Sequence, residues 1–285
     1  MKKILYLLIL TVLLAGCTDA YANVSNPKED VLTVGETSFT KSDLFSLMVN
    51  QDPATLVIQM AKQKILEKEM PLSDAVKEKA QEELDYVKEI FGDEFLTNIK
   101  LYGFTSEQDY IDRALVPASQ ELLLTEKFVD ENFDLLLIKY LPKKVRVIEF
   151  NDVEKATSAL AEIKDGKNVE AVATQYSTST TYKGLEQLVH IESSLPAVVT
   201  SFINENQLPT LSSEPLFQET TSKYYIVQLV ETSPAKFEDE IKEELSALTS
   251  VNEMVFEKYF VDGGFAVYDK GIYDSVQASY SNYLN

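Results

Sequence analysis

Residues 145–156 read VRVIEFNDVEKA, and this stretch decides the predicted fold. Three β-branched residues and Phe150 between positions 145 and 150 predict a short strand. Asn151 and Asp152 are favoured helix-capping residues, and the pattern after them predicts a helix that runs to Lys164. A strand that leads straight into a helix indicates a mixed region of helix and sheet.

Pro142, followed by two lysines, separates this stretch from a helical region before it. That region opens with a strand from Val31 and a turn at Gly35. Capping patterns predict successive helix starts at Thr40 with Asp43, Asp52 with Pro53, Ser73, and Thr105 with Gln108. A further helix is predicted from Pro117 to Leu137.

After residue 164 the mixed region continues and then returns to helix. Its predicted elements are a helix at 169–176, an apolar segment at 188–191, a helix at 196–204 and a strand at 223–230. After Pro234 the apolar positions from Phe237 to Val255 recur three or four residues apart, which predicts one long helix. A last helical pattern extends to Tyr280.

Length and charge restrict the class of protein. A chain of 285 residues is long enough for about two domains. Its formal charge is −20, and residues 1–16 carry two lysines and no acid, so their removal leaves −22. Such a field repels phosphate backbones, which excludes nucleic acid as a partner. It either attracts basic polypeptides or serves solubility alone.

The N-terminal residues predict a lipoprotein signal. Two lysines precede an apolar run from Ile4 to Leu14, which is too short to cross a bilayer. LAGC at 14–17 resembles the bacterial lipobox, in which the signal is cut before the cysteine and the thiol receives a lipid. Cys17 is the sole cysteine, so no disulfide within one molecule can use it; the alternative is an ordinary small residue. The polar residues that follow, through Asp30, are typical of a flexible tether.

Few residue types remain for catalysis. The sequence has one histidine, His190, between two apolar residues, and no G-x-S-x-G motif, so we interpret it as a structural or surface residue. No metal-ligand spacing, phosphate loop or dinucleotide fingerprint is present, and we expect no metal and no cofactor. Acidic pairs are frequent in so acidic a chain and indicate nothing specific.

Four segments in order over about ninety residues resemble a parvulin-type peptidyl-prolyl isomerase domain. GKNVEAVATQYS at 166–177 resembles the pattern G-x-x-F-x-x-L-A-x-x-Y-S. SEPL at 213–216 resembles S-[DE]-P-V, and YYIV at 224–227 resembles the closing strand Y-H-I-I. The opening strand at 145–150 completes the set.

The departures from that family pattern lie where its chemistry would be. Val147 and Tyr225 stand where the resemblance implies two histidines. SLPAV at 194–198 matches the segment M-x-P-E-F, with Ser194 and Val198 in place of the Met and Phe walls of the proline pocket. Gly184 alone is retained from a G-G-D-L-G turn. We therefore expect no catalytic residues and a degenerate pocket formed by Val147, Ser194, Val198 and Tyr225.

The whole chain resembles a PrsA-type foldase lipoprotein, a family related to SurA chaperones. The resemblance implies an α+β fold in which the N- and C-terminal segments form one helical chaperone domain around an inserted parvulin-like α/β domain. The expected division is a signal peptide at 1–16, a lipidated cysteine and tether at 17–30, helical segments at 31–141 and 235–285, and the parvulin-like domain at 142–234.

The resemblance also implies the function. We expect a chaperone or foldase that is lipid-anchored at the extracytoplasmic face of the bacterial cell membrane and binds unfolded or partly folded secreted polypeptides. Loss of both histidines argues against prolyl isomerase activity. An active isomerase and a ligand-binding or adhesive surface lipoprotein remain as alternatives, and a homodimer is left open.

Overall fold

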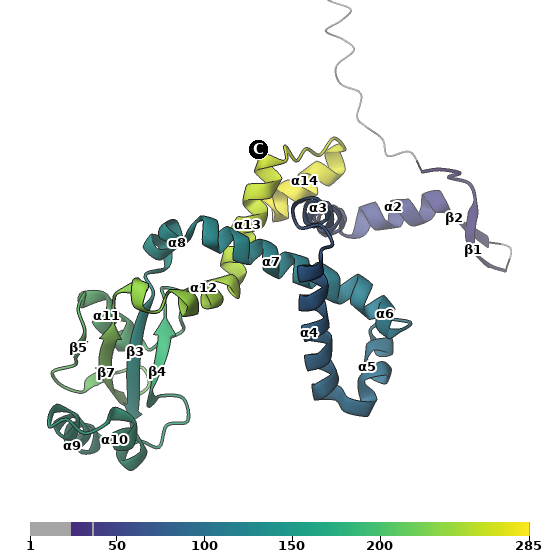
Figure 1. The fold of residues 1–285 in the computed structure, drawn as a ribbon. Helices are drawn as coiled ribbons and strands as arrows, with labels where there is room; N and C mark the ends of the chain where they lie inside the picture. Colours follow the sequence, from purple (N-terminus) through teal and green to yellow (C-terminus); the bar gives the residue numbers. More distant parts are fainter. Residues whose placement is uncertain (1–23, 36, 285) are drawn as a thin grey trace, which may run out of the picture. The chain divides into compact units, whose positions relative to one another are not determined.

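The computed structural model describes residues 24–35 and 37–284. Its contacts divide the chain into two compact units. Unit 1 comprises the chain up to Thr125 together with the residues from Thr249 onward, and unit 2 comprises Glu126–Leu248 (Figure 1). The first and last parts of the chain thus share one unit, and the α+β fold class predicted from the sequence is confirmed. The narrower division at residues 142 and 234 stays a prediction.

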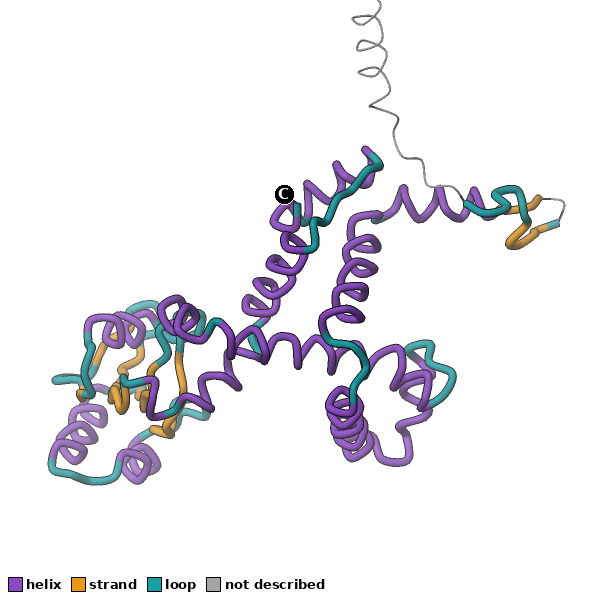
Figure 2. The backbone as a smooth tube through the Cα atoms, turned by 45° about the horizontal axis from the view of Figure 1, so that its top comes forward, coloured by secondary structure: helices purple, strands orange, loops and turns teal. Residues whose placement is uncertain are grey.

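Unit 1 opens with a two-stranded antiparallel hairpin that leads into a helix. Strands β1 (Asp30–Val34) and β2 (Thr37–Thr40) precede helix α2 (Lys41–Gln51). The capping box predicted for this helix is confirmed, because the Asp43 N–H donates to the Thr40 hydroxyl and the Thr40 N–H donates to Asp43 Oδ2 at 2.9 Å. Strands in the described residues occur here and in unit 2 alone (Figure 2).

The remaining N-terminal elements of unit 1 are helical. They are α3 (Pro53–Glu69), α4 (Asp74–Phe91), η1 (Gly92–Glu94), α5 (Phe95–Leu101), α6 (Glu107–Tyr110), η2 (Ile111–Leu115) and α7 (Val116–Glu131), the last of which continues into unit 2. The predicted caps of α3 and α4 are confirmed, since Asp52 accepts from the Thr55 N–H and Ser73 from the Val76 N–H. Apolar side chains of α4, α5 and η2, among them Leu84, form one buried cluster.

The cap predicted at Thr105 is wrong by one residue. The hydroxyl of Ser106 accepts the Asp109 N–H at 3.1 Å and thereby caps α6. Thr105 instead donates its N–H and its hydroxyl to Asp109 Oδ2, and the Gln108 side chain donates to Asp112. An aspartate one residue beyond the expected partner moves the cap, because its carboxylate reaches back to Thr105.

The C-terminal elements of unit 1 are α13 (Thr249–Asp262), α14 (Lys270–Ser279) and η4 (Ser281–Tyr283). α13 and α14 contact α3. The Lys62 ammonium lies 4.1 Å from the centre of the Phe256 ring, and the hydroxyls of Thr55 and Tyr280 are 2.9 Å apart. These contacts join segments about two hundred residues apart in the sequence.

Unit 2 contains a five-stranded antiparallel sheet with helices on both faces. Its elements are α8 (Phe133–Tyr140), β3 (Lys143–Phe150), α9 (Val153–Lys164), α10 (Val169–Tyr176), β4 (Lys183–Val189), α11 (Ala197–Glu205), β5 (Thr210–Leu211), β6 (Leu216–Gln218), β7 (Lys223–Glu231), η3 (Pro234–Lys236) and α12 (Glu238–Ser246). The strand order is β4-β3-β7-β5, and β6 also pairs with β7. The predicted strands at 145–150 and 223–230 are therefore the adjacent central pair.

The alternation of side chains along β3 and β7 builds two separate cores. Ile148 and Ile226 point to the face that α9 and α10 cover, whereas Val147 and Val227 point to the face that α11 covers. A strand with both faces buried reads as a nearly continuous apolar run, as VRVIEF does. Gly184 lets β4 approach α10, because its φ is +74° and an added Cβ would lie 3.1 Å from Val169.

Two helices expected to be continuous are broken. The one predicted from Pro117 to Leu137 divides at Asn132, whose side chain donates to the Phe128 carbonyl. The long helix predicted from Phe237 divides at Ala247 and Leu248, where the backbone forms bonds to the third residue back. Apolar periodicity persists across both breaks, so periodicity alone could not locate them.

Candidate functional site

The two positions that stand in place of histidines lie on the α11 face of the sheet. Val147 is buried on β3 and pairs with Val227, and Tyr225 is buried on β7 and pairs with Glu149. Val147 and Tyr225 are therefore diagonal neighbours, and both belong to one apolar cluster. The structure places them together, at 1% and 2% exposure, so neither side chain presents a functional group to solvent.

Ser194 and Val198 lie at the border of the same cluster. Val198 packs against it, and its N–H donates to Gln218 Oε1 at 3.1 Å. The Ser194 carbonyl lies 3.4 Å from the Tyr182 hydroxyl, and the Tyr182 ring meets the Tyr225 ring edge-on at 5.9 Å. Val147 and Tyr225 thus belong to this apolar cluster, Val198 packs against it, and Ser194 reaches it only through Tyr182.

A polar network at the end of this surface was not predicted from the sequence. Glu149, whose side chain is mostly buried, accepts a hydrogen bond from the Tyr225 hydroxyl at 3.0 Å and pairs with Lys223 Nζ at 2.6 Å. The Tyr182 carbonyl accepts the Glu149 N–H at 3.3 Å. The available signal was a lone acid at the end of a buried strand, which requires a partner.

The pKa values of the two tyrosines in this network are raised. Burial, together with the hydrogen bond to Glu149, raises the pKa of Tyr225 to about 12. Burial and the charge of Glu149 also raise the pKa of Tyr182. Both hydroxyls therefore keep their protons near neutral pH, and Tyr225 donates a hydrogen bond to Glu149, whose charge partner is Lys223. The network joins β3 to β7.

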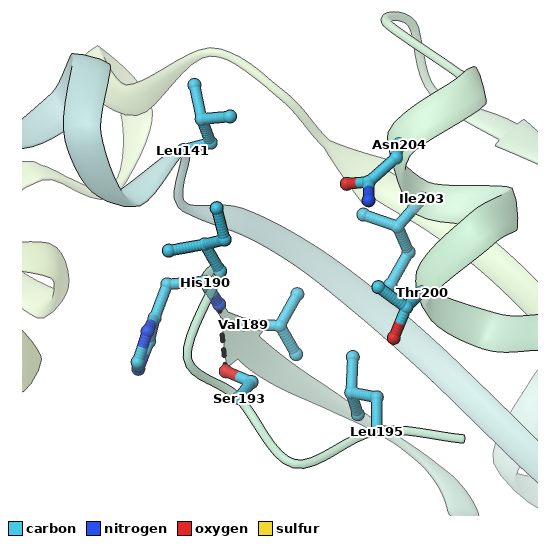
Figure 3. Close-up of a pocket in the computed structure, with 9 residues that line it drawn as sticks. Leu141, Val189, His190, Ser193, Leu195, Thr200, Ile203 and Asn204 are labelled. Atoms are coloured by element: carbon cyan, nitrogen blue, oxygen red, sulfur yellow. Dashed lines mark hydrogen bonds between the residues drawn. The ribbon is translucent and has the colours of Figure 1, made fainter. Parts of the chain in front are cut away.

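His190 has a structural environment. Its side chain is buried, its Nε2 lies 3.5 Å from Glu244 Oε1, and its ring meets Tyr140 edge-on. Figure 3 shows that the Ser193 hydroxyl accepts a hydrogen bond from the backbone N–H of His190, at 2.8 Å, and this bond does not involve the ring. The cavity beside it has a volume of about 40 Å³, room for a few water molecules at most.

A larger groove lies in unit 1, between α3 and the segment from η2 to α7. Its volume is about 770 Å³, within the usual range of ligand sites. Leu66, Leu72, Val116 and Pro117 form its apolar part, and Gln59, Gln63, Gln120, Lys62, Arg113, Glu67, Asp112 and Glu121 contribute amides and charges. The groove therefore mixes apolar side chains with amides and both signs of charge.

The structure does not describe the expected lipid anchor, and the residues that it does describe can be searched for membrane-spanning helices and metal sites. Cys17 and the expected signal at 1–16 are outside the described residues. Among residues 24–35 and 37–284, no helix is long and apolar enough to cross a membrane. Within the same residues, no group of three or more His, Cys, Asp or Glu side chains is arranged to hold a metal ion.

Comparison with known proteins gives matches to solved structures alone. No model of a protein family matches, and no curated protein matches. The chain is similar to the foldase protein PrsA of Streptococcus pneumoniae, at 18% identity over 90% of this chain and 100% of that one, with a TM-score of 0.49. It is also similar to the peptidylprolyl isomerase PrsA of Bacillus cereus, at 19% identity over 89% and 99%, with a TM-score of 0.49.

A more distant match is a SurA-like chaperone of Campylobacter jejuni, at 20% identity over 82% of this chain and 95% of that one, with a TM-score of 0.27. These structures are of the two kinds that the sequence resembles.

Proposed function

We propose that this protein is a folding factor that binds unfolded or partly folded secreted polypeptides outside the cytoplasm, held at the membrane by a lipid on Cys17. The observation that carries the proposal is the groove of about 770 Å³ in unit 1. An extended polypeptide offers apolar side chains and backbone amides at once. The groove supplies matching partners for both, which suits binding without sequence preference.

The second part of the proposal is that the parvulin-like domain has no prolyl isomerase activity. Rotation about a prolyl bond faces a barrier of about 18–20 kcal/mol, so a catalyst must hold the twisted amide better than the planar one. Valine and tyrosine side chains fill the surface where the resemblance implies two histidines. The hydroxyl of Tyr225 is already engaged by Glu149.

Charge supports the choice of polypeptide partners. The formal charge of −20 attracts basic segments and disfavours nucleic acid and anionic surfaces. This attraction acts over about 8–10 Å at physiological ionic strength. It therefore speeds the approach of a basic polypeptide, whereas the contacts in the groove determine how tightly the polypeptide binds.

Aggregation suppression tests the proposal with a matched pair of variants. Leu72→Glu places a charge in the groove wall, and Leu208→Glu makes the same change at an exposed leucine of unit 2. We expect the mature chain to slow aggregation of an unfolded secreted protein, Leu72→Glu to weaken this several-fold, and Leu208→Glu to leave it unchanged. No suppression by the unaltered chain, or equal losses in both variants, would contradict the proposal.

A proline-peptide assay tests the second part. The unaltered chain should give no rate enhancement above the uncatalysed isomerisation. A clear enhancement would instead support the alternative of an active isomerase.

A further inference from the structure

A second hollow in unit 1 is almost wholly apolar. It lies between the β1–β2 hairpin and α2, has a volume of about 590 Å³, and is lined by Val31, Leu32, Phe39, Leu44 and Leu47 with Ser38 and Asp43. Leu32 and Leu47 are 52% and 54% exposed, and α2 buries none of its residues. This set of lining residues is called the hairpin hollow below.

The hairpin hollow lacks the packing that normally sustains such elements. A lone two-stranded hairpin is only marginally stable in water, and an amphipathic helix draws most of its stability from burial of its apolar side. Met48 of α2 and Val34 of β1 are likewise exposed, at 45% and 67%. Contiguous apolar surface of this kind marks a site that another apolar phase or molecule covers.

The chain on the N-terminal side restricts where the hollow can lie. Residues just before β1 fold back on α2, because the Lys41 N–H donates to the Glu29 carbonyl and the Ser42 N–H to the Pro27 carbonyl, both at 2.9 Å. Lys41 Nζ also pairs with Glu29 Oε2 at 2.5 Å. Eight residues lie between Cys17 and Asn26, and the nine steps from one Cα to the next span at most about 32 Å when fully extended.

We infer that the hairpin hollow docks on the outer surface of the membrane and takes lipid acyl chains between β1, β2 and α2. The inference rests on the lipid anchor of the proposed function, which would keep the hollow within about 32 Å of the bilayer. Because the anchor makes this second contact intramolecular, even a weak apolar surface would stay docked. Amphipathic helices that lie on membranes bury their apolar side into the boundary between headgroups and acyl chains.

The local charge defines which lipids would favour docking. Residues 24–51 contain two lysines and four acids, so anionic headgroups are not attracted. Docking would therefore depend on acyl chains and be strongest on zwitterionic lipid. This distinguishes it from the basic surfaces that bind anionic membranes.

The absence of tryptophan from the sequence permits a direct test. In the lipid-anchored full chain, Leu47→Trp places a sole tryptophan in the hairpin hollow, and Leu208→Trp places one on unit 2 as the control. The anchored proteins are reconstituted on phosphatidylcholine vesicles whose acyl chains carry bromine near the headgroup. We expect quenching of Leu47→Trp at least threefold greater than that of Leu208→Trp, and less quenching when phosphatidylglycerol is added at low salt.

Further variants separate docking from loss of folding. Leu44→Glu in the Leu47→Trp chain should reduce quenching at least threefold, whereas Leu101→Glu, at another exposed leucine of unit 1, should leave it unchanged. Circular dichroism checks that both remain folded. Aggregation suppression without vesicles should be the same in Leu44→Glu as in the unaltered chain, so the client groove and the hollow can fail independently.

Several results would overturn the inference. Equal quenching at both tryptophan positions, or none at Leu47→Trp in chains that float with the vesicles, would do so while leaving the proposed function intact. If the chains do not float with the vesicles, they carry no lipid anchor, and the inference loses its premise. If a higher protein concentration alone removes the quenching of Leu47→Trp by lipid, the hollow binds a second copy of the chain. If only an added unfolded polypeptide removes it, the hollow binds clients.

Discussion

The sheet of unit 2 and the helices of unit 1 differ in how completely they bury their apolar side chains. β3 and β7 bury both of their faces, one under α9 and α10 and the other under α11. In unit 1, α2 buries none of its residues, and a groove of about 770 Å³ lies beside α3. The difference teaches that unit 2, whose sequence resembles an isomerase domain, covers both faces of its central strands, whereas unit 1 keeps a groove and exposed apolar side chains.

The largest expected effect contrasts a covered with an uncovered isoleucine. Ile226→Ala should destabilise unit 2 by about 2–5 kcal/mol, because it leaves a cavity in the sheet core. Ile90→Ala in unit 1 should change stability by no more than about 0.5 kcal/mol, since that side chain is 58% exposed. Denaturant unfolding followed by hydrogen exchange in β3, β7 and α4 measures both. Equal costs would break the comparison.

The next effect concerns the pH dependence of the covered face. The pKa of Tyr225 is about 12 in the folded chain, above the ordinary 10.0, so the folded state keeps a proton that the unfolded state loses. Its contribution is fully present below pH 10 and is lost as the pH rises toward 12, by about 2–3 kcal/mol. Tyr225→Phe should remove this part of the dependence.

Unfolding at pH 8, 10 and 11 with both proteins isolates Tyr225 from the lysines that titrate in the same range. A difference between the two proteins that stays constant from pH 8 to 11 would contradict the network with Glu149.

A smaller effect follows from placing a histidine in the closed surface. Val147→His should destabilise unit 2 by about 1–3 kcal/mol, because a polar ring replaces a side chain that is 1% exposed. Val147→His combined with Tyr225→His should still give no isomerase activity, since Ser194 and Val198 do not rebuild the pocket walls. If the double variant catalysed proline-peptide isomerisation, the loss of two histidines alone would account for the missing activity.

The smallest effect distinguishes two adjacent residues in unit 1. Ser106→Ala should destabilise α6 by about 1 kcal/mol, because the cap of the Asp109 N–H is lost. Thr105→Val should cost less than about 0.5 kcal/mol, since its hydroxyl only adds a second contact to Asp109. Hydrogen exchange of the first turn of α6 reports both. A larger loss in Thr105→Val would restore the cap predicted from the sequence.

The candidate site was only partly predictable from residue patterns. Val147 and Tyr225 could be named because each stands in a segment that resembles a family motif, and the register then places both in one cluster. Glu149 was missed, although it lies two residues from Val147, because its partner Tyr225 is 76 residues away. The groove was missed for the same reason, since its walls come from α3 and from η2 and α7.

By itself, the sequence determined what depends on neighbours three or four residues apart. The caps at Thr40, Asp52 and Ser73 and the strand at 145–150 follow from such local bonds and alternation. Only the tertiary structure decided that α13 and α14 pack on α3, that Tyr225 covers Glu149, and that the hairpin hollow stays open. Burial is a property of segments distant in the chain, so their packing alone determines which apolar faces are closed and which remain for a partner.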